Sequence, residues 1–282
     1  MEIIALPADM QHWTEGARRH GKTIAFVPTM GFLHEGHLTL MREGRKRASV
    51  LASSLFVNPT QFGPNEDLSR YPRNFERDCS MMREVPVDVL FAPEPEVMYP
   101  PGSQTWVEVT DMTQGLCGAH RAGHFRGVTT VVAKLFNIVK PHIALFGEKD
   151  YQQLRTIERM VQDLNFAIEI VAVPTVREPD GLAMSSRNSY LSPEQRKQAL
   201  ALNGALRAAG ALFRSGVRDP RKLVQSARDW LARAPEVEVE YVEAVDAKTL
   251  QTVEHIERPV VVAVAAHIGA TRLIDNIVFA PE

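Results

Sequence analysis

The sequence has few cysteines and no long hydrophobic run. Its 282 residues include only two cysteines, Cys79 and Cys117, which lie far apart in the chain. A disulfide framework or a cysteine-based zinc site needs several cysteines at short spacing, so both are excluded and free thiols are expected. No stretch approaches the ~20 apolar residues of a membrane-spanning helix, and the first residues lack the pattern of a secretory signal. We therefore expect a cytoplasmic protein that does not associate with membranes.

An excess of charge of either sign is also absent. Lys and Arg together number 32 and Asp and Glu 34, which gives a net charge of −2. Such a chain has no overall field that would attract nucleic acid or anionic lipid, so neither is expected as a partner and any basic site must be local. The length is typical of one large domain or two, at roughly 150 residues each.

The first two thirds of the chain contain β-branched or apolar runs that alternate with segments of helical period. The runs predict buried strands at residues 23–27, 50–57, 87–91, 142–146 and 168–173. The other segments predict helices at residues 36–48, 74–85, 127–140 and 151–164. This alternation is typical of an α/β fold with a Rossmann-like parallel sheet, which binds ligands at the carboxyl ends of its strands.

The last third of the chain has a different pattern. Ser192 followed by Pro193 predicts the start of a long Ala- and Leu-rich helix that ends near Gly216. A second helix is predicted at residues 220–234, with strands at 237–245, 260–266 and 273–279. We therefore predict a Rossmann-like domain over residues 1–176 and a smaller α+β domain over residues 177–282.

The densest chemical signal is PTMGFLHEGHL at residues 28–38, where a predicted strand ends and a helix begins. Helix amides at such a corner point outward and favour an anion. His34 and His37 project from the same side of the first turn, so both can donate hydrogen bonds to phosphate oxygens. A lone histidine here would more often cap the helix or lie in the core, but a pair around a glycine favours phosphate. Zinc is a weaker interpretation, because the spacing differs from HExxH and no partner ligand lies nearby.

Residues 146–153, with the sequence FGEKDYQQ, also follow a predicted strand. Lys149 can supply a positive charge for phosphate, and Gln153 lies on the same side of the helix to bind a polar substrate group. The alternative is an ordinary charged turn.

Residues 176–188 join the two predicted domains. Ser185, Ser186 and Arg187 offer hydroxyl and guanidinium donors that suit phosphate oxygens. A solvated linker fits the composition equally well.

Residues 56–63 follow the second predicted strand, at the same sheet edge as His34. Asn58 and Gln61 offer uncharged amides for a small hydroxy acid, and an Asn-Pro turn with a surface glutamine is the alternative. The basic loop at residues 120–127 either faces an anion or is solvated, and its role stays open.

At these residues the chain resembles the pantothenate synthetase family, adenylate-forming ligases that join pantoate to β-alanine. The resemblance rests on PTMGFLHEGHL, LFVNPTQFGPNEDLSRYPR, GHFRGVTTVVAKLFNIVKPHIALFGEKDYQQL and MSSRNSYLS, which occur in order over most of residues 23–191. HEGH alone would indicate only the broader nucleotidylyltransferase group. Phe32, where a small residue is common, and Ala122, where proline is expected, depart from the family pattern.

The resemblance implies an ATP site and a substrate site. Pantoate and then β-alanine would lie against Gln61, with Gln153 also holding pantoate and Asn58 nearby. His37 would donate a proton, with His34 and Lys149 also catalytic. The adenine would lie near Val176. The ATP-binding residues implied are Met30, Gly31, Phe32, Leu33, His34, Glu35, Gly36, His37, Gly147, Glu148, Lys149, Asp150, Val176, Met184, Ser185, Ser186 and Arg187.

The implied reaction has two steps. The pantoate carboxylate attacks the α-phosphorus of ATP to give pantoyl adenylate and pyrophosphate, and β-alanine then displaces AMP to form the amide. ATP is thus a substrate, with Mg²⁺ as a cofactor whose ligands are unknown; Asp78 or Glu148 could contact it through water. The smaller domain would close as a lid. The family also suggests a homodimer.

The residues alone are also compatible with three other functions. A nucleotidylyltransferase would transfer AMP permanently to a phosphate acceptor, and a metal hydrolase would hold stoichiometric zinc. A nucleotide sensor without catalysis is a third alternative, although the amides of Asn58 and Gln61 make poor sense without a second substrate.

Overall fold

The computed structural model describes residues 1–64 and 66–281. Asn65 and Glu282, the predicted last residue of the second domain, lie outside the described residues. The chain divides into two compact units, of which the first comprises Met1–Thr110, Arg121–Glu148 and Thr156–Pro174 and the second Asp111–His120, Lys149–Arg155 and Thr175–Glu282. The predicted domains, residues 1–176 and 177–282, stay a prediction, because compactness alone does not define a domain.

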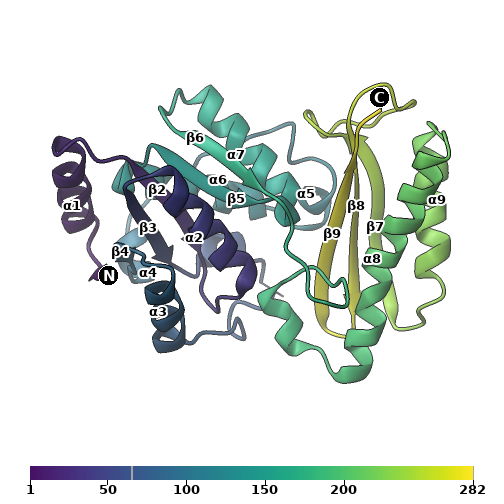
Figure 1. Ribbon diagram of the computed structural model, residues 1–282, viewed down its shortest axis with the longest axis horizontal. Helices are drawn as coiled ribbons and strands as arrows, with labels where there is room; N and C mark the ends of the chain where they lie inside the picture. Colours follow the sequence, from purple (N-terminus) through teal and green to yellow (C-terminus); the bar gives the residue numbers. More distant parts are fainter. Residues whose placement is uncertain (65, 282) are drawn as a thin grey trace. The chain divides into compact units, whose positions relative to one another are not determined.

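The first unit is built on a six-stranded sheet in the order β1-β4-β3-β2-β5-β6 (Figure 1). All neighbouring strands are parallel, which confirms the predicted α/β class. The strands are β1 (Glu2–Ile4), β2 (Ile24–Thr29), β3 (Val50–Leu55), β4 (Val89–Phe91), β5 (Ile143–Gly147) and β6 (Glu169–Val173). Only β1 was not predicted.

Helices connect these strands. They are α1 (Pro7–Arg19), α2 (Glu35–Arg47), α3 (Phe75–Glu84), α4 (Pro95–Met98), α6 (His124–Val139) and α7 (Tyr151–Asp163), with the 3-10 helices η1 (Pro59–Gln61) and η2 (Glu148–Asp150). The helices α2, α3, α6 and α7 match the predicted segments within three residues at their ends. The helices α1 and α4 are not among the predicted segments.

The two faces of the parallel sheet are buried against different helices. Along β5, Leu145 packs in one apolar cluster with Met41 of α2 and Met82 of α3. The next residue, Phe146, packs edge-on against Phe136 of α6, with ring centroids 6.4 Å apart. Neighbouring residues of a strand point to opposite faces, so α2 and α3 cover one face and α6 the other. Covered faces are what an all-parallel sheet requires.

The direction of chain progression reverses at β2. From β2 the chain moves outward through β3 to β4, and it later returns to β5, which pairs with the other edge of β2. In open α/β sheets, ligands bind outside the carboxyl ends of the strands at such a reversal. These ends are Thr29 of β2 and Gly147 of β5. Two of the segments that the sequence analysis assigned to phosphate therefore begin at neighbouring strand ends.

The second unit contains an antiparallel sheet in the order β7-β8-β9, with α8 and α9 on one face (Figure 1). Ser192 and Gln195 form a capping box at the start of α8, with Pro193 at its first position, as predicted for Ser192 and Pro193. The elements confirm the predicted smaller α+β part. They are α5 (Cys117–His120), η3 (Ser186–Tyr190), α8 (Pro193–Arg214), α9 (Pro220–Leu231), β7 (Val237–Asp246), β8 (Val260–Ile268) and β9 (Thr271–Phe279).

Earlier parts of the chain pack on the other face of this antiparallel sheet. Tyr241 pairs with Ala265, which points away from the α8 cluster. The Tyr241 hydroxyl lies 3.1 Å from the sulfur of Cys117, which is buried and free, as is Cys79. Residues 111–120 thus belong to the second unit by their contacts, although they precede β5 in the sequence.

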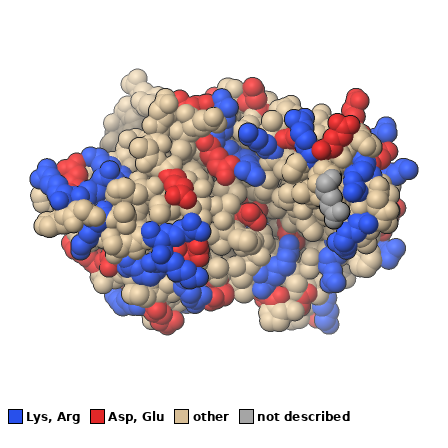
Figure 2. Space-filling view, turned by 45° about the horizontal axis from the view of Figure 1, so that its top comes forward, with Lys and Arg blue, Asp and Glu red and all other residues tan. Residues whose placement is uncertain are grey.

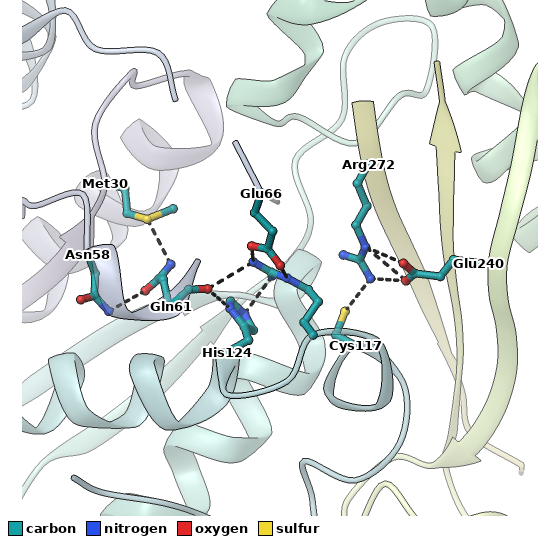
Figure 3. Close-up of polar contacts among 9 residues, drawn as sticks. Met30, Asn58, Gln61, Glu66, Cys117, His124, Glu240 and Arg272 are labelled. Atoms are coloured by element: carbon teal, nitrogen blue, oxygen red, sulfur yellow. Dashed lines mark hydrogen bonds and ion pairs between the residues drawn. The ribbon is translucent and has the colours of Figure 1, made fainter. Parts of the chain in front are cut away.

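Polar contacts fasten these earlier segments. The Arg272 guanidinium binds the Glu240 carboxylate at 2.5 Å and also reaches the sulfur of Cys117 (Figure 3). Burial raises the pKa of Glu240, but the hydrogen bonds and charge of Arg272 outweigh it and hold this pKa below its usual range. At the start of α7, the hydroxyl of Tyr151 donates to the carbonyl of Ala247 at 2.8 Å.

No helix in residues 1–64 or 66–281 is long and apolar enough to cross a membrane. On the face shown in Figure 2, Lys and Arg side chains are interspersed with Asp and Glu, in keeping with the near-balanced composition.

The start of β2 provides a test of pH dependence. Nδ1 of His142 accepts a hydrogen bond from the Ile24 backbone at 3.0 Å, and burial together with Arg18 lowers the pKa of this imidazole. The unfolded chain then binds the proton more tightly, so the free energy of unfolding should fall as pH drops below about 6.5. Asn has an acceptor that does not titrate. Urea titrations between pH 7.5 and 5.5 should show a smaller loss for His142→Asn than for the wild type, and equal losses would contradict this.

Candidate functional site

The turn that follows β2 is held by one buried carboxylate. Both oxygens of Asp78 accept backbone N–H groups, from Phe32 at 2.7 Å and from Leu33 at 2.8 Å. Gly31 and Phe32 have φ values of 88° and 50°, in the left-handed region that favours glycine. A Cβ at Gly31 would lie 3.1 Å from the Asp78 carboxylate. The turn is therefore fixed by its contact with α3 before any ligand binds.

The two histidines lie together at the start of α2. His34 is the N-cap and His37 occupies the third helical position, and their ring centroids are 4.1 Å apart. The backbone N–H of His34 points at Nδ1 of His37, at 3.3 Å. A backbone N–H can only donate, so Nδ1 of His37 is the acceptor and Nε2 carries the proton in the neutral ring. The pair thus presents a donor of the kind that the phosphate interpretation requires. Glu35 pairs with Arg42.

Asn58 and Gln61 lie together in and beside η1, and both are buried. The Asn58 amide donates to the Gln61 side-chain oxygen at 3.1 Å (Figure 3). It also donates to the Gly127 carbonyl at 3.1 Å, and its oxygen accepts from Tyr99 at 2.9 Å. The Gln61 nitrogen lies 3.1 Å from the sulfur of Met30. The side chain of Asn58 is therefore hydrogen-bonded within the protein, whereas Gln61 directs its N–H₂ group toward Met30.

The segment after β5 contributes to both units. Gly147 and Glu148 belong to the first unit, and Lys149 and Asp150 follow directly in the second. The Lys149 carbonyl accepts from the Asn276 side chain at 2.9 Å, which fixes the backbone that carries the lysine.

The two glutamines of α7 have different environments. Gln152 is buried and donates to the carbonyls of Met112 and Gly115, each at 2.9 Å. The next residue, Gln153, points elsewhere on the helix and is half-buried. Gln152 therefore has a structural position, and Gln153 remains the candidate for substrate.

Residues 176–188 form a hairpin and a 3-10 turn. Arg177 bridges to Ala183, and the N–H of Met184 donates to the Val176 carbonyl at 3.0 Å. The Ser185 hydroxyl caps η3 by accepting the N–H of Arg187 at 3.3 Å. Two ion pairs of Arg196, with Glu178 and Asp180 at 2.6 Å each, hold the hairpin against α8. These contacts make residues 176–188 an ordered part of the second unit and argue against a solvated linker.

Comparison with known proteins shows the family of the chain. Residues 2–278 match the family model of the pantoate-beta-alanine ligases. The chain belongs to this family. It is 58% identical over 277 residues to the pantothenate synthetase of Myxococcus xanthus, covering 97% of this chain and 94% of the relative. It is 55% identical to that of Geobacter sulfurreducens over the full length of both chains.

Solved structures of this family share the fold. A pantothenate synthetase from Thermus thermophilus has a TM-score of 0.93 at 45% identity, with 98% of this chain and 99% of the other covered. A pantoate-beta-alanine ligase from Francisella tularensis, complexed with beta-gamma ATP and beta-alanine, has a TM-score of 0.80 at 32% identity, with 98% and 97% covered. The chain is thus a ligase that condenses pantoate with β-alanine through pantoyl adenylate, releasing AMP and pyrophosphate, and ATP is its substrate.

One role in this ligase, that of Asp78, has no signal in the sequence. A contact with Mg²⁺ through water is the expectation for this residue, but both of its oxygens bind the turn at residues 31–33 and its side chain is 2% exposed. No local pattern marks this role, because Asp78 is 45 residues from Leu33 in the sequence.

The substitution Asp78→Asn tests this role. An amide can accept only one of the two backbone N–H groups and turns its own donors toward the other. We expect the free energy of unfolding to fall by about 1–3 kcal/mol and the KM for ATP to rise. Asp229→Asn, at an exposed position of α9, is the matched control and should change stability by less than about 0.5 kcal/mol. Urea titration measures the free energy of unfolding of both variants. An Asp78→Asn variant with an unchanged free energy of unfolding would contradict the assignment.

Proposed function

We propose that this ligase binds ATP through three segments of the chain. The residues are those of the turn and first helical turn at 30–37, of the β5 end at 147–150, and of the hairpin at 176 and 184–187. The supporting observation is the reversal at β2 and β5, because the ends of these strands carry the first two segments and ligands bind at such reversals. The hairpin adds hydroxyl and guanidinium groups that suit phosphate.

Pantoate is assigned to Gln61 and Gln153. The Gln61 amide is buried and oriented by Asn58, and its nitrogen faces the weak acceptor of Met30, which a hydroxyl or carboxylate oxygen of pantoate can replace. The contacts of Asn58 support an indirect part for this residue, as the group that orients Gln61. β-Alanine then binds beside the same amide.

The chemistry follows from position and charge. The pantoate carboxylate attacks the α-phosphorus of ATP, and the negative charge that develops is stabilised by Lys149, Arg187 and the His34–His37 pair. His37, whose Nε2 carries the proton, donates it toward the phosphate oxygens. The amine of β-alanine then attacks the acyl carbon and AMP leaves. No step needs a protein nucleophile, since the adenylate is the activated intermediate.

Mg²⁺ enters this proposal as part of the nucleotide substrate. Within residues 1–64 and 66–281, no cluster of three His, Cys, Asp or Glu side chains is arranged to hold a metal ion. Mg²⁺ in nucleotide sites commonly keeps its waters and binds phosphates with one or two carboxylates. Glu148 at the β5 end is the carboxylate that remains assigned to this contact.

The assembly and compartment are also proposals. Membership in the family supports a homodimer that acts in the cytoplasm, with the smaller C-terminal domain as a lid over the adenylate. Sedimentation equilibrium should give twice the mass of 31.5 kDa, and a monomer at micromolar concentration would contradict the dimer.

The substitutions His37→Ala and Lys149→Ala test the charge-stabilising groups. Each should lower the rate of adenylate formation by more than ~100-fold, because each removes a donor that acts where charge develops. His12→Ala and Lys22→Ala, at exposed positions, are matched controls that should keep the rate within twofold. Single-turnover pyrophosphate release measures the rate, and circular dichroism checks the fold. Near-normal turnover of either site variant contradicts its role.

Pyrophosphate release from ATP tests the whole proposal. Pantoate alone should release up to one pyrophosphate per site, and β-alanine should then allow repeated turnover with AMP and an amide as products. A nucleotidylyltransferase would instead leave AMP attached to its acceptor. Absence of pantoate-dependent release contradicts the proposed function.

A further inference from the structure

The loop at residues 120–127, which the sequence left without a role, lies at the start of α6 and contacts η1. Gly123 is the N-cap of α6 with a φ of 77°, and His124 is the first residue of the helix. A Cβ at Gly127 would lie 2.4 Å from the Thr60 carbonyl oxygen and 2.7 Å from the Gln61 nitrogen. Glycine at this position therefore lets the first turn of α6 touch the backbone that carries Gln61.

The imidazole of His124 contacts the Gln61 carbonyl, and its two neighbours define its protonation state. Its Nδ1 lies 2.7 Å from that carbonyl oxygen and its Nε2 lies 3.0 Å from the Arg121 guanidinium (Figure 3). A carbonyl can only accept and a guanidinium can only donate, so Nδ1 carries the proton and Nε2 does not. The imidazole is thus neutral, with a donor or acceptor facing each nitrogen.

Arg121 is held in turn by Glu66. The guanidinium binds the two carboxylate oxygens at 2.8 and 2.5 Å, and its side chain is only 13% exposed. It also reaches the Gln61 carbonyl at 3.4 Å. Burial raises the pKa of Glu66, but the hydrogen bonds and charge of Arg121 outweigh it and hold this pKa below its usual range. The positive charge of Arg121 is therefore matched inside the protein, and a substrate anion is not needed to balance it.

We propose that His124, with Arg121 and Glu66 behind it, is a positioning residue that fixes Gln61 for pantoate. His124 sets the backbone of residue 61, and Asn58 sets its side-chain oxygen, so the amide N–H₂ group has one direction in which to meet the substrate. Arg121 and His124 then act through Gln61 and do not themselves bind an anion. This inference rests on the proposed binding of pantoate by Gln61.

Two isosteric substitutions separate the nitrogens of His124. In His124→Asn the amide N–H₂ can take the place of Nδ1 and still donate to the Gln61 carbonyl. In His124→Gln the amide reaches the place of Nε2, so the contact with Arg121 is kept and the carbonyl loses its short hydrogen bond, keeping only the 3.4 Å contact with Arg121. We expect the KM for pantoate to rise about tenfold in His124→Gln and to stay within about threefold of wild type in His124→Asn, because the loss of its short hydrogen bond leaves the backbone of Gln61 less firmly fixed.

The KM for ATP and the melting temperature serve as the other readouts. A general loss of folded protein would lower kcat without raising the KM for pantoate, so the KM change distinguishes positioning from stability. In a Gln61→Ala background, His124→Gln should add less than about twofold to the KM for pantoate, because the group that it positions is gone.

The outcomes separate this inference from the proposed function. A normal KM for pantoate in Gln61→Ala overturns the pantoate site itself. A raised KM in Gln61→Ala with a normal KM in His124→Gln overturns only the positioning role. Equal effects of His124→Asn and His124→Gln, or additive effects with Gln61→Ala, also overturn it.

Discussion

The pairing of β2 with β5 is the constraint on which the rest of the first unit depends. Because β3 and β4 lie on one side of β2 and β5 and β6 on the other, the carboxyl ends of the two central strands adjoin. Each strand is followed at once by a segment whose backbone leaves the sheet, Met30 to His37 after one and Glu148 to Asp150 after the other. The topology thus places side by side two strand ends, Thr29 and Gly147, that are more than a hundred positions apart in the sequence.

Fixed polar contacts then give the junction its detail. Asp78 fixes the turn after β2 through two N–H groups, and Asn58 binds Gly127, Tyr99 and Thr60 while it orients Gln61. Each of these buried groups has its hydrogen bonds within the protein, which makes the local geometry costly to change. The turn after β2 and the Gln61 amide are therefore preorganised, so a ligand that meets them needs to spend little binding energy on arranging them.

Much of the fold could be predicted from the sequence, because its signals are local. The period of α6, the cap at Ser192 and the apolar runs of the central strands each lie within a few residues. The strand β1 has only three residues and so shows no period, and α1 buries little more than Met10 and Thr14 and so shows no apolar stripe.

The candidate site also contains some features with local sequence signals and others without them. His34 and His37 could be predicted as neighbours because they are three residues apart at a helix start, and their ring centroids lie 4.1 Å apart. The pairing of Lys149 with Gln153 stays a prediction, because Lys149 lies in η2 and Gln153 in α7. The parts of Asp78 and of the Glu66–Arg121 pair could not be found, because their partners are distant in sequence and lie side by side only in the folded chain. Asn58 shows the same limit, since an amide in a sequence does not reveal whether protein or ligand satisfies it.

The contact between Cys117 and Tyr241 also bears on the order in which the chain folds during synthesis. The two residues are 124 positions apart, and the strand that carries Tyr241 leaves the ribosome long after the segment that holds Cys117. At roughly 5–20 residues per second, residues 111–120 wait several seconds or more for the sheet that buries them. The second unit is therefore completed only when the last strands have been made, and a nascent chain that ends before β7 exposes a segment destined for the interior.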